Sequence, residues 1–355
     1  MKGILLHGGH GTRLRPLTHT GPKQLLPIAN KPMSQYCIES MIDAGVKEIA
    51  IIIGGVGSNK VREFYGNGEK FGIKISYVEQ DSPKGIAHAI GLCKEFIGNN
   101  KFLVFLGDNI IQKSIRESAK NFIESDADAL ILLCEVDNPS RFGIADMKEG
   151  KIVKILEKPT IPPTNFAVTG IYFLTPKIFE IIENLKPSHR NELEITDALD
   201  KLLIQNNKII YDIITDYWKD TGTPEDIIHA NMAILEKMNP YFNGKKDEEV
   251  IITGNIMIGN NTIIKKDVTL IGPIIIGDGC VIESHTKIGP NVSIGDNSRL
   301  SGCAVNNSIV MNDCVVEGSI SITNSIIAGN SNISFLTDSR KDKVFLLGEG
   351  TIISL

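Results

Sequence analysis

The chain has 355 residues, a length that suggests two domains or three. Its 37 Lys and Arg against 42 Asp and Glu give a formal net charge of −5, which argues against a dedicated nucleic-acid binder because such proteins carry a basic surface. The 42% of hydrophobic and 22% of charged residues are typical of a globular protein and exclude a disordered one.

Residues 1–238 alternate strand-like and helix-like segments. Short apolar runs predict strands at 2–6, 46–53, 73–79, 102–106, 129–136 and 168–174, with a hairpin over 144–156. Helical spacing predicts helices at 31–44, 85–96, 176–185, 195–205 and 224–238. Strands separated by helices of this length predict a Rossmann-like, mostly parallel α/β sheet that is covered on both faces.

A polar, turn-rich segment at 239–249, predicted to be a linker, precedes an internal repeat. Aliphatic residues recur at every sixth position: Ile252, Ile258, Ile264, Leu270, Ile276, Ile282, Ile288, Ile294 and Leu300. A period of six does not fit a helix, but it fits short strands and tight turns stacked in coils. The pattern resembles the hexapeptide repeat of left-handed parallel β-helices, which implies such a domain, with a C-terminal tail, over 250–355.

No apolar run is long enough for a membrane span or for the core of a signal peptide. The six cysteines form no CxxC pair, and none has a histidine at zinc-like spacing. We therefore expect a cytoplasmic protein that does not associate with membranes or nucleic acid.

The first predicted strand leads into a glycine-rich segment, Gly8 to Leu14, with the sequence GGHGTRL. Glycines let backbone N–H groups approach a phosphate closely, and Arg13 adds a cation that offsets polyphosphate charge. A second cation, Lys23, lies between Pro22 and an apolar run. The segment lacks the Gly-Lys-Ser/Thr of a Walker A loop and the third glycine of a Rossmann fingerprint. It therefore predicts a phosphate-binding loop of another class.

Eight sequence blocks together resemble the sugar-1-phosphate nucleotidylyltransferases, and specifically the glucose-1-phosphate thymidylyltransferases. The blocks are 8–16, 23–27, 80–87, 106–109, 157–159, 167–172, 192–197 and 218–223, and they follow the family's order. The added β-helix matches the long form of the family, whereas His7 departs from the alanine that is usual in the short form. The resemblance implies a Mg²⁺-dependent enzyme that makes dTDP-glucose and pyrophosphate from dTTP and glucose-1-phosphate.

The resemblance also implies roles for individual residues. Arg13 and Lys23 are the expected catalytic residues, because both reactants are anions whose repulsion must be neutralised. Asp108 and Asp220 are the expected Mg²⁺ ligands, since Mg²⁺ prefers hard oxygen donors. The expected nucleotide-binding residues are Leu6, Gly8, Gly9, Gly11, Thr12, Gln24, Gln80, Pro83 and Gly85. The expected sugar-phosphate-binding residues are Asn109, Gly143, Glu157, Lys158 and Val168.

Three alternatives stay open at this point. Thymine and uracil share the base edge that Gln80 would read, so UTP or both nucleotides could be the substrate. Hexapeptide β-helices also occur in acyltransferases, where His285 would be the candidate base. The reading that we favour is that the β-helix is structural and that it holds the protein in a homo-oligomer.

Overall fold

The computed structural model describes residues 1–8, 11–335 and 339–354. The chain forms two compact units. Met1–His10 and Met33–Asp220 make up the first unit, and Gly11–Pro32 and Thr221–Leu355 make up the second. A segment from near the N-terminus thus belongs to the same unit as the C-terminal third of the chain.

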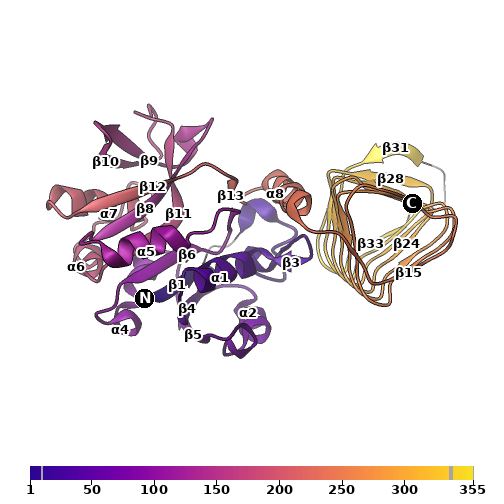
Figure 1. The fold of residues 1–355 in the computed structure, drawn as a ribbon, viewed down its shortest axis with the longest axis horizontal. Coiled ribbons are helices and arrows are strands. Elements are labelled where there is room, and N and C mark those ends of the chain that lie inside the picture. The colour runs from indigo at the N-terminus through magenta and orange to yellow at the C-terminus, as the bar shows by residue number, and fades with distance from the viewer. Residues whose placement is uncertain (9–10, 336–338, 355) are drawn as a thin grey trace. The chain divides into compact units, whose positions relative to one another are not determined.

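A mixed nine-stranded sheet is the centre of the first unit (Figure 1). Its strands are β1 (Lys2–Leu6), β4 (Glu48–Ile53), β5 (Lys74–Glu79), β6 (Phe102–Leu106), β8 (Ala129–Glu135), β9 (Gly143–Lys148), β10 (Lys151–Glu157), β11 (Phe166–Leu174) and β12 (Ile209–Ile214). Strands β6, β1, β4 and β5 are parallel neighbours, whereas β11 runs antiparallel to β6 and β8. The predicted Rossmann-like α/β sheet is confirmed.

Helices cover the sheet because its strands are apolar on both faces. The helices of this unit are α1 (Met33–Asp43), α2 (Ser58–Tyr65), α3 (Ile86–Gly91), α4 (Lys94–Ile97), α5 (Arg116–Glu124), α6 (Lys177–Glu183) and α7 (Ile195–Ile204), with short 3₁₀ helices at Glu69–Phe71 and Pro139–Arg141. One core cluster joins residues of α3, α6 and α7 to the sheet. The helix predicted over 85–96 is two pieces, α3 and α4. The small sheet of β7 (Asn109–Ile111) and β13 (Trp218–Asp220) was not predicted.

Three parallel sheets form the β-helix of the second unit. The first β-helix sheet contains β14 (Tyr241–Phe242), β17 (Ile256–Ile258), β20 (Ile274–Ile276), β23 (Val292–Ile294), β26 (Ile309–Val310), β29 (Ile326–Ile327) and β32 (Leu346–Leu347). The second contains β15 (Lys245–Lys246), β18 (Ile263–Ile264), β21 (Val281–Ile282), β24 (Arg299–Ser301), β27 (Val315–Glu317), β30 (Asn332–Ser334) and β33 (Ile352–Ser354). The third contains β16 (Ile251–Thr253), β19 (Thr269–Ile271), β22 (Lys287–Ile288), β25 (Ala304–Asn306), β28 (Ile320–Thr323) and β31 (Ser339–Lys343).

The inward-facing residues of the hexapeptide pattern make the β-helix core. From Ile258 to Leu300 each of them is completely buried. The segment 239–249, predicted as a linker, carries β14 and β15, which pair with β17 and β18. Parallel sheets of this kind confirm the predicted β-helix fold.

Helix α8 (Pro224–Lys237), the hairpin of β2 (Pro27–Ile28) and β3 (Lys31–Pro32), and the 3₁₀ helices Thr12–Leu14 and Lys23–Leu25 complete the second unit. The side chain of Thr223 and that of Asp226 form a capping box at the start of α8.

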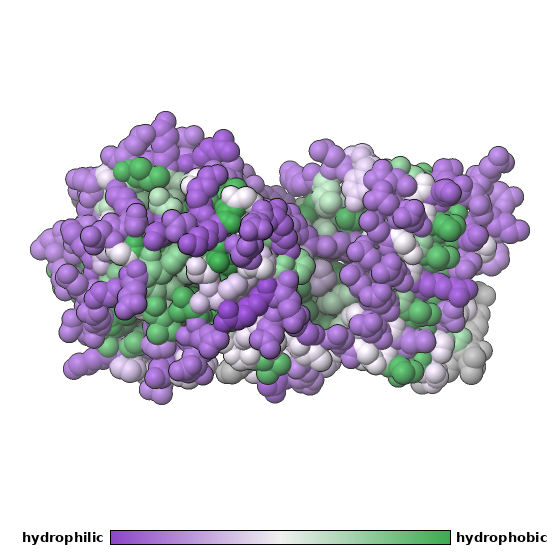
Figure 2. Space-filling view, turned by 90° about the horizontal axis from the view of Figure 1, so that it is seen from below, coloured by the Kyte–Doolittle hydropathy of each residue, from purple (hydrophilic) through white to green (hydrophobic). Residues whose placement is uncertain are grey.

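Hydrophilic residues cover most of the face in Figure 2, and hydrophobic residues lie between them in small groups. In the described part of the chain, no helix combines the length and the apolar character that a membrane crossing requires.

Candidate active site

Four neighbouring parallel strands of the first unit end at one edge of the sheet. There the backbone N–H of His7 donates to the carbonyl oxygen of Ile52 (2.9 Å). The N–H of Gly107 donates to the carbonyl oxygen of Leu6 (2.9 Å), and the N–H of Gln80 donates to that of Ile53 (2.8 Å). These bonds continue the ladders by one residue and fix the start of each following loop. Ligands of open α/β sheets bind at this carboxyl edge. The structure therefore brings the candidates Leu6, Gly8, Gln80 and Asp108 to the same edge.

The small β7–β13 sheet pairs the two segments that carry the predicted metal ligands. Asp220 lies directly opposite Asn109 in the antiparallel register, next to Asp108 in the chain. Nδ2 of Asn109 donates to Oδ1 of Asp108 (3.0 Å), and its Oδ1 accepts from Trp218 Nε1 (2.8 Å) and from the backbone N–H of Gly170 (3.1 Å). Asn109 thus ties three strands together and orients Asp108.

This pair of carboxylates fits the donor set of Mg²⁺, which takes one or two carboxylates together with phosphate oxygens and water. No group of three or more His, Cys, Asp or Glu side chains suited to a metal occurs among the residues that the structure describes.

His7, the residue that departs from the family pattern, is buried beside this edge. Burial lowers the pKa of His7 to about 3, and the nearby Asp108 offsets only part of that effect. Its ring meets Tyr65 edge-on at 5.9 Å between centroids, and neither ring nitrogen has a hydrogen-bond partner among the described residues. His7 is therefore a neutral imidazole at neutral pH.

The base-binding candidates of the first unit lie on the loop after β5 and at the loop after β1. A Cβ atom on Gly8 would lie 3.2 Å from Oε1 of Gln80, so the glycine gives room to that amide. Nε2 of Gln80 lies 2.9 Å from Nδ1 of His88, which orients the amide. Gly85 has φ 103°, and a Cβ there would lie 2.4 Å from the carbonyl oxygen of Leu193. Pro83 is exposed on the same loop.

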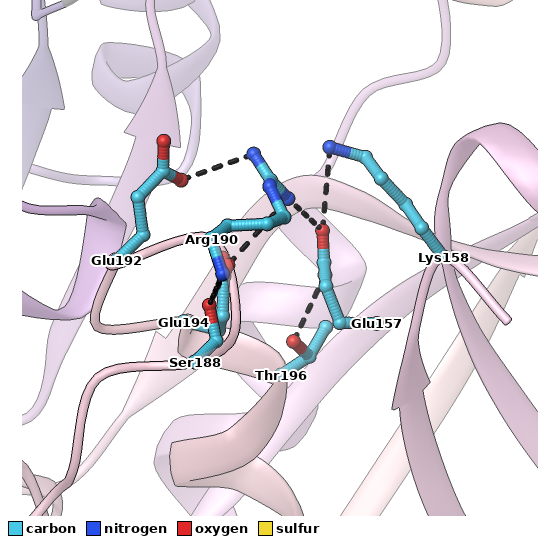
Figure 3. Close-up of polar contacts among 7 residues, drawn as sticks. All are labelled: Glu157, Lys158, Ser188, Arg190, Glu192, Glu194 and Thr196. Carbon is cyan, nitrogen blue, oxygen red and sulfur yellow. Dashed lines mark hydrogen bonds and ion pairs between the residues drawn. The ribbon is translucent and has the colours of Figure 1, made fainter.

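Three of the five sugar-phosphate candidates, Gly143, Lys158 and Val168, lie near a fourth, Glu157. Figure 3 shows the carboxylate of Glu157 with Lys158 and its other polar neighbours. Gly143 pairs with Glu157 in the β9–β10 hairpin, and a Cβ on Gly143 would lie 3.5 Å from Oε2 of Glu157 and 3.8 Å from Cβ of Val168. Oε1 of Glu157 lies 3.4 Å from Nζ of Lys158. The fifth candidate, Asn109, lies with the aspartates described above.

Two further residues of this cluster were missed from the sequence. Oγ1 of Thr196 donates to Oε2 of Glu157 (2.9 Å), and Nη1 of Arg190 donates to its Oε1 (2.9 Å). Arg190 also pairs with Glu192 (3.1 Å) and Glu194 (3.5 Å). Thr196 lies inside the block 192–197 that carried the resemblance, and Arg190 lies two residues before it. The position of the Arg190 cation next to that block was the sequence signal that could have identified it as a candidate.

The remaining candidates belong to the second unit. Oγ1 of Thr18 donates to the carbonyl of Gly11 (2.8 Å), and a Cβ on Gly11 would lie 3.4 Å from Cβ of Lys23. A Cβ on Gly222 would lie 3.1 Å from both terminal nitrogens of Arg13, so the first motif block and the last one meet here. Thr12 starts the 3₁₀ helix that carries Arg13, and Gln24 is buried in the next one. Gly9 lies outside the described residues.

His285, the candidate base of an acyltransferase, is exposed in the turn between β21 and β22, with φ 62°.

Comparisons with known proteins identify the family of the chain. The family model described as nucleotidyl transferase matches residues 2–237, and the model described as GMPPB C-terminal domain matches residues 270–353. The low-salt glycan biosynthesis nucleotidyltransferase Agl11 of Haloferax volcanii is 41% identical over the full length of both chains. A glucose-1-phosphate thymidylyltransferase of Streptomyces antibioticus is 37% identical, over 88% of this chain and 87% of its own.

Solved structures resemble the first two thirds of the chain. A Bacillus anthracis protein described as a glucose-1-phosphate thymidylyltransferase, in complex with sucrose, has a TM-score of 0.64 and 40% identity, over 68% of this chain and 98% of its own. A UDP-glucose pyrophosphorylase complexed with UDP-glucose has a TM-score of 0.60 and 30% identity, over 67% of this chain and 99% of its own. The resemblance inferred from the motif blocks is therefore confirmed: the chain belongs to the nucleotidyl transferase family, and glucose-1-phosphate thymidylyltransferases are among its homologues.

Proposed function

We propose that this nucleotidyltransferase makes dTDP-glucose and pyrophosphate from dTTP and glucose-1-phosphate in a Mg²⁺-dependent reaction. The observation that carries the proposal is the β7–β13 pairing. It sets Asp220 opposite Asn109, the residue that follows Asp108 in the chain, at the sheet edge where ligands of such folds bind. The names of the relatives in Streptomyces and Bacillus support the choice of substrates.

The reaction is an in-line attack of a sugar-phosphate oxygen on the α-phosphorus of the triphosphate, with pyrophosphate as the leaving group. The attacking phosphate is already ionised, so the protein needs no strong general base. Arg13 holds the triphosphate, and Lys23 neutralises the charge that develops at the α-phosphate. Backbone N–H groups of Gly8, Gly9, Gly11 and Thr12 complete the binding of the phosphates. Asp108 and Asp220 hold Mg²⁺, which supplies charge neutralisation at the phosphate oxygens when it is bound.

The cluster around Glu157 supports its assignment to glucose-1-phosphate. The carboxylate of Glu157 accepts hydrogen bonds from sugar hydroxyl groups, while Lys158 and Arg190 provide positive charge for the phosphate. Gly143 and Val168 form the wall beside the carboxylate, and Asn109 adds an amide.

Gln80, assisted by Gln24, reads the O4 and N3–H edge of the base, and Leu6, Pro83 and Gly85 frame it. Because uracil presents the same edge, UTP is the alternative nucleotide, and the UDP-glucose pyrophosphorylase among the similar structures favours keeping it. One methyl group is worth about 1–3 kcal/mol of discrimination, so we expect a preference for dTTP with measurable use of UTP.

We further propose that residues 1–238 carry the catalytic residues, that 239–249, whose strands β14 and β15 join the β-helix sheets, lead into the β-helix over 250–355, and that the β-helix supports a homo-oligomer. A cytoplasmic location agrees with six cysteines that are all free and buried. Acyl transfer at His285 is the less favoured alternative, since its side chain is exposed in a turn.

The test is a pyrophosphate-release assay that crosses dTTP, UTP, CTP and GTP with several sugar-1-phosphates in the presence of Mg²⁺. We expect the highest kcat/KM for dTTP with glucose-1-phosphate. A higher value for UTP supports the alternative nucleotide, and no release with any pair overturns the proposed function. A parallel incubation with acetyl-CoA and sugar nucleotides tests acyl transfer.

A further inference from the structure

Five outward-facing residues in the middle of the first β-helix sheet are buried, although they lie on the outside of the β-helix. The register aligns Met257, Ile275, Ser293, Ile309 and Ile326 in one column. None of them is more than 5% exposed, and none belongs to the inner core of the β-helix. Elements of the same unit pack against Met257, Ile275 and Ser293 of this column.

Helix α8 covers its first coils. Leu235, Ile234 and Met238 form an apolar cluster with Met257 and Ile275. Ala29, from the tip of the β2–β3 hairpin, belongs to the same cluster. The hairpin that follows the predicted phosphate loop is thus packed with α8 against the β-helix.

A buried hydrogen-bond network holds the hairpin tip in place. Oδ1 of Asn231, on α8, accepts from the backbone N–H of Ala29 (2.8 Å) and from Oγ of Ser293 on β23 (2.6 Å). Nδ2 of Asn30 donates to the carbonyl of Ile294 (2.6 Å). Ser293 is the one polar residue among these five, and its hydroxyl group donates to Asn231 in this network.

The backbone of the tip agrees with a tightly held turn. Ala29 and Asn30 both have positive φ, 47° and 60°. This conformation costs a residue with a Cβ about 1–2 kcal/mol, so the surrounding contacts must offset it.

A second contact lies nearer the start of the segment. A Cβ on Gly348, which follows β32, would lie 3.3 Å from Cβ and from the carbonyl oxygen of Pro16. The segment 11–32 therefore meets the β-helix unit at Pro16 and again at Ala29 and Asn30. Lys23 lies between these two points, and Arg13 lies three residues before the first.

We propose that the outer face of the first β-helix sheet is the platform that positions Arg13 and Lys23, and that Ser293 is a positioning residue of nucleotidyl transfer. This inference rests on the proposed function, because it assigns those two cations to the triphosphate. The β-helix then contributes to turnover in each chain, beyond any role in oligomerisation. It does so through the geometry of the segment 11–32, without contacting the reacting atoms.

The test compares Ser293→Ala and Asn30→Asp with a matched control, Ser308→Ala, in the full-length protein. Ser308 is also buried in the β-helix, but its hydroxyl group bonds to the carbonyl of Asn306 and to the N–H of Ser325. The control therefore removes a similar hydrogen bond away from the segment 11–32. Asn30→Asp keeps the size and the turn preference of the side chain, but removes the donor to Ile294.

Steady-state kinetics are measured well below the melting temperature, with each substrate varied in turn. We expect Ser293→Ala and Asn30→Asp to lower kcat/KM for dTTP about tenfold, the effect of one lost hydrogen bond, with KM for glucose-1-phosphate unchanged. Ser308→Ala should keep the wild-type kinetic constants.

Wild-type constants in both variants, or an equal loss in the Ser308 control, would overturn the inference while the proposed function stands. Absence of nucleotidyl transfer in the wild-type protein would instead overturn the proposed function. The two failures are therefore distinguishable.

Discussion

A methyl group added at Gly143 tests whether Glu157 is held ready for the sugar by Thr196. A Cβ at Gly143 would lie 2.5 Å from Cγ2 of Thr196, about 1 Å or more inside ordinary carbon–carbon contact. Gly143 lies outside the positive-φ region, so alanine strains the side-chain packing and leaves the backbone unstrained. Thr196 must therefore move, and its hydroxyl group loses the 2.9 Å bond to Oε2 of Glu157.

A hydrogen bond to a charged group contributes about 1.5–3 kcal/mol, which corresponds to a change in affinity of about 10- to 150-fold. We expect Gly143→Ala to raise KM for glucose-1-phosphate within that range and to leave KM for dTTP unchanged. Thr196→Ser removes the Cγ2 atom that clashes and keeps the hydroxyl group, so the single variant should behave like the wild type. The double variant should recover most of the affinity that Gly143→Ala loses.

The assay is pyrophosphate release with glucose-1-phosphate varied at saturating dTTP, for the wild type, the two single variants and the double variant. A double variant as impaired as Gly143→Ala alone would refute the reasoning, because it would show that the clash with Thr196 is not the cause.

Three further predictions concern the metal ligands, the buried histidine and the base-binding loop. Asp108→Asn should abolish Mg²⁺-dependent pyrophosphate release without changing the melting temperature, and full activity would refute the metal assignment. The pKa of His7 falls from 6.5 to about 3 on folding, so the unfolded state binds a proton more readily than the folded state. The free energy of unfolding therefore keeps its full value above pH 6.5 and decreases as the pH falls toward 3. At pH 5 this loss is about 2 kcal/mol, so chemical denaturation should show a steeper fall from pH 7 to 5 in the wild type than in His7→Asn. Equal slopes would refute it. Gly85→Ala should destabilise the fold more than Gly45→Ala, because both glycines have positive φ but only Gly85 faces a carbonyl oxygen at 2.4 Å; equal losses in thermal denaturation would contradict this.

The β-helix shows which part of the fold the sequence periodicity could predict. Coils of 18 residues, such as the step from Thr269 to Lys287, keep the pattern of six visible in the sequence. From Arg299 to Val315 the step shortens to 16 residues, and from Ile326 to Leu346 it lengthens to 20, so the pattern fades after Leu300 while the coils continue. Ile252 obeys the pattern and is still 37% exposed, because it lies in the first coil, whose outer edge has no neighbouring strand in the described chain.

The candidate site likewise contains residues that the sequence could predict and residues that it could not. Strand ends and motif blocks predicted which candidates lie at the sheet edge, because the strands are continuous apolar runs that are easy to recognise. The antiparallel pairing of Asp220 with Asn109 could not be predicted, since it joins three-residue strands more than 100 residues apart. Arg190 was not predicted as a candidate residue for a similar reason. Its importance comes from ion pairs with Glu157, Glu192 and Glu194, and those pairs depend on a loop conformation that has no periodicity.

The charged residues to which we assign roles in the reaction depend on the packing of two different units. Asp108, Asp220 and the cluster around Glu157 belong to the first unit, with its mixed sheet and its β7–β13 pair, whereas Arg13 and Lys23 belong to the unit that is built on the β-helix. A substitution that loosens one packing should therefore leave the groups of the other in place. If the roles are assigned correctly, variants near Glu157 change KM for the sugar phosphate, and variants on the outer β-helix face change kcat/KM for the triphosphate. A residue such as Ser293, which has no catalytic chemistry of its own, then affects nucleotide transfer because its hydroxyl group helps to fix two cations.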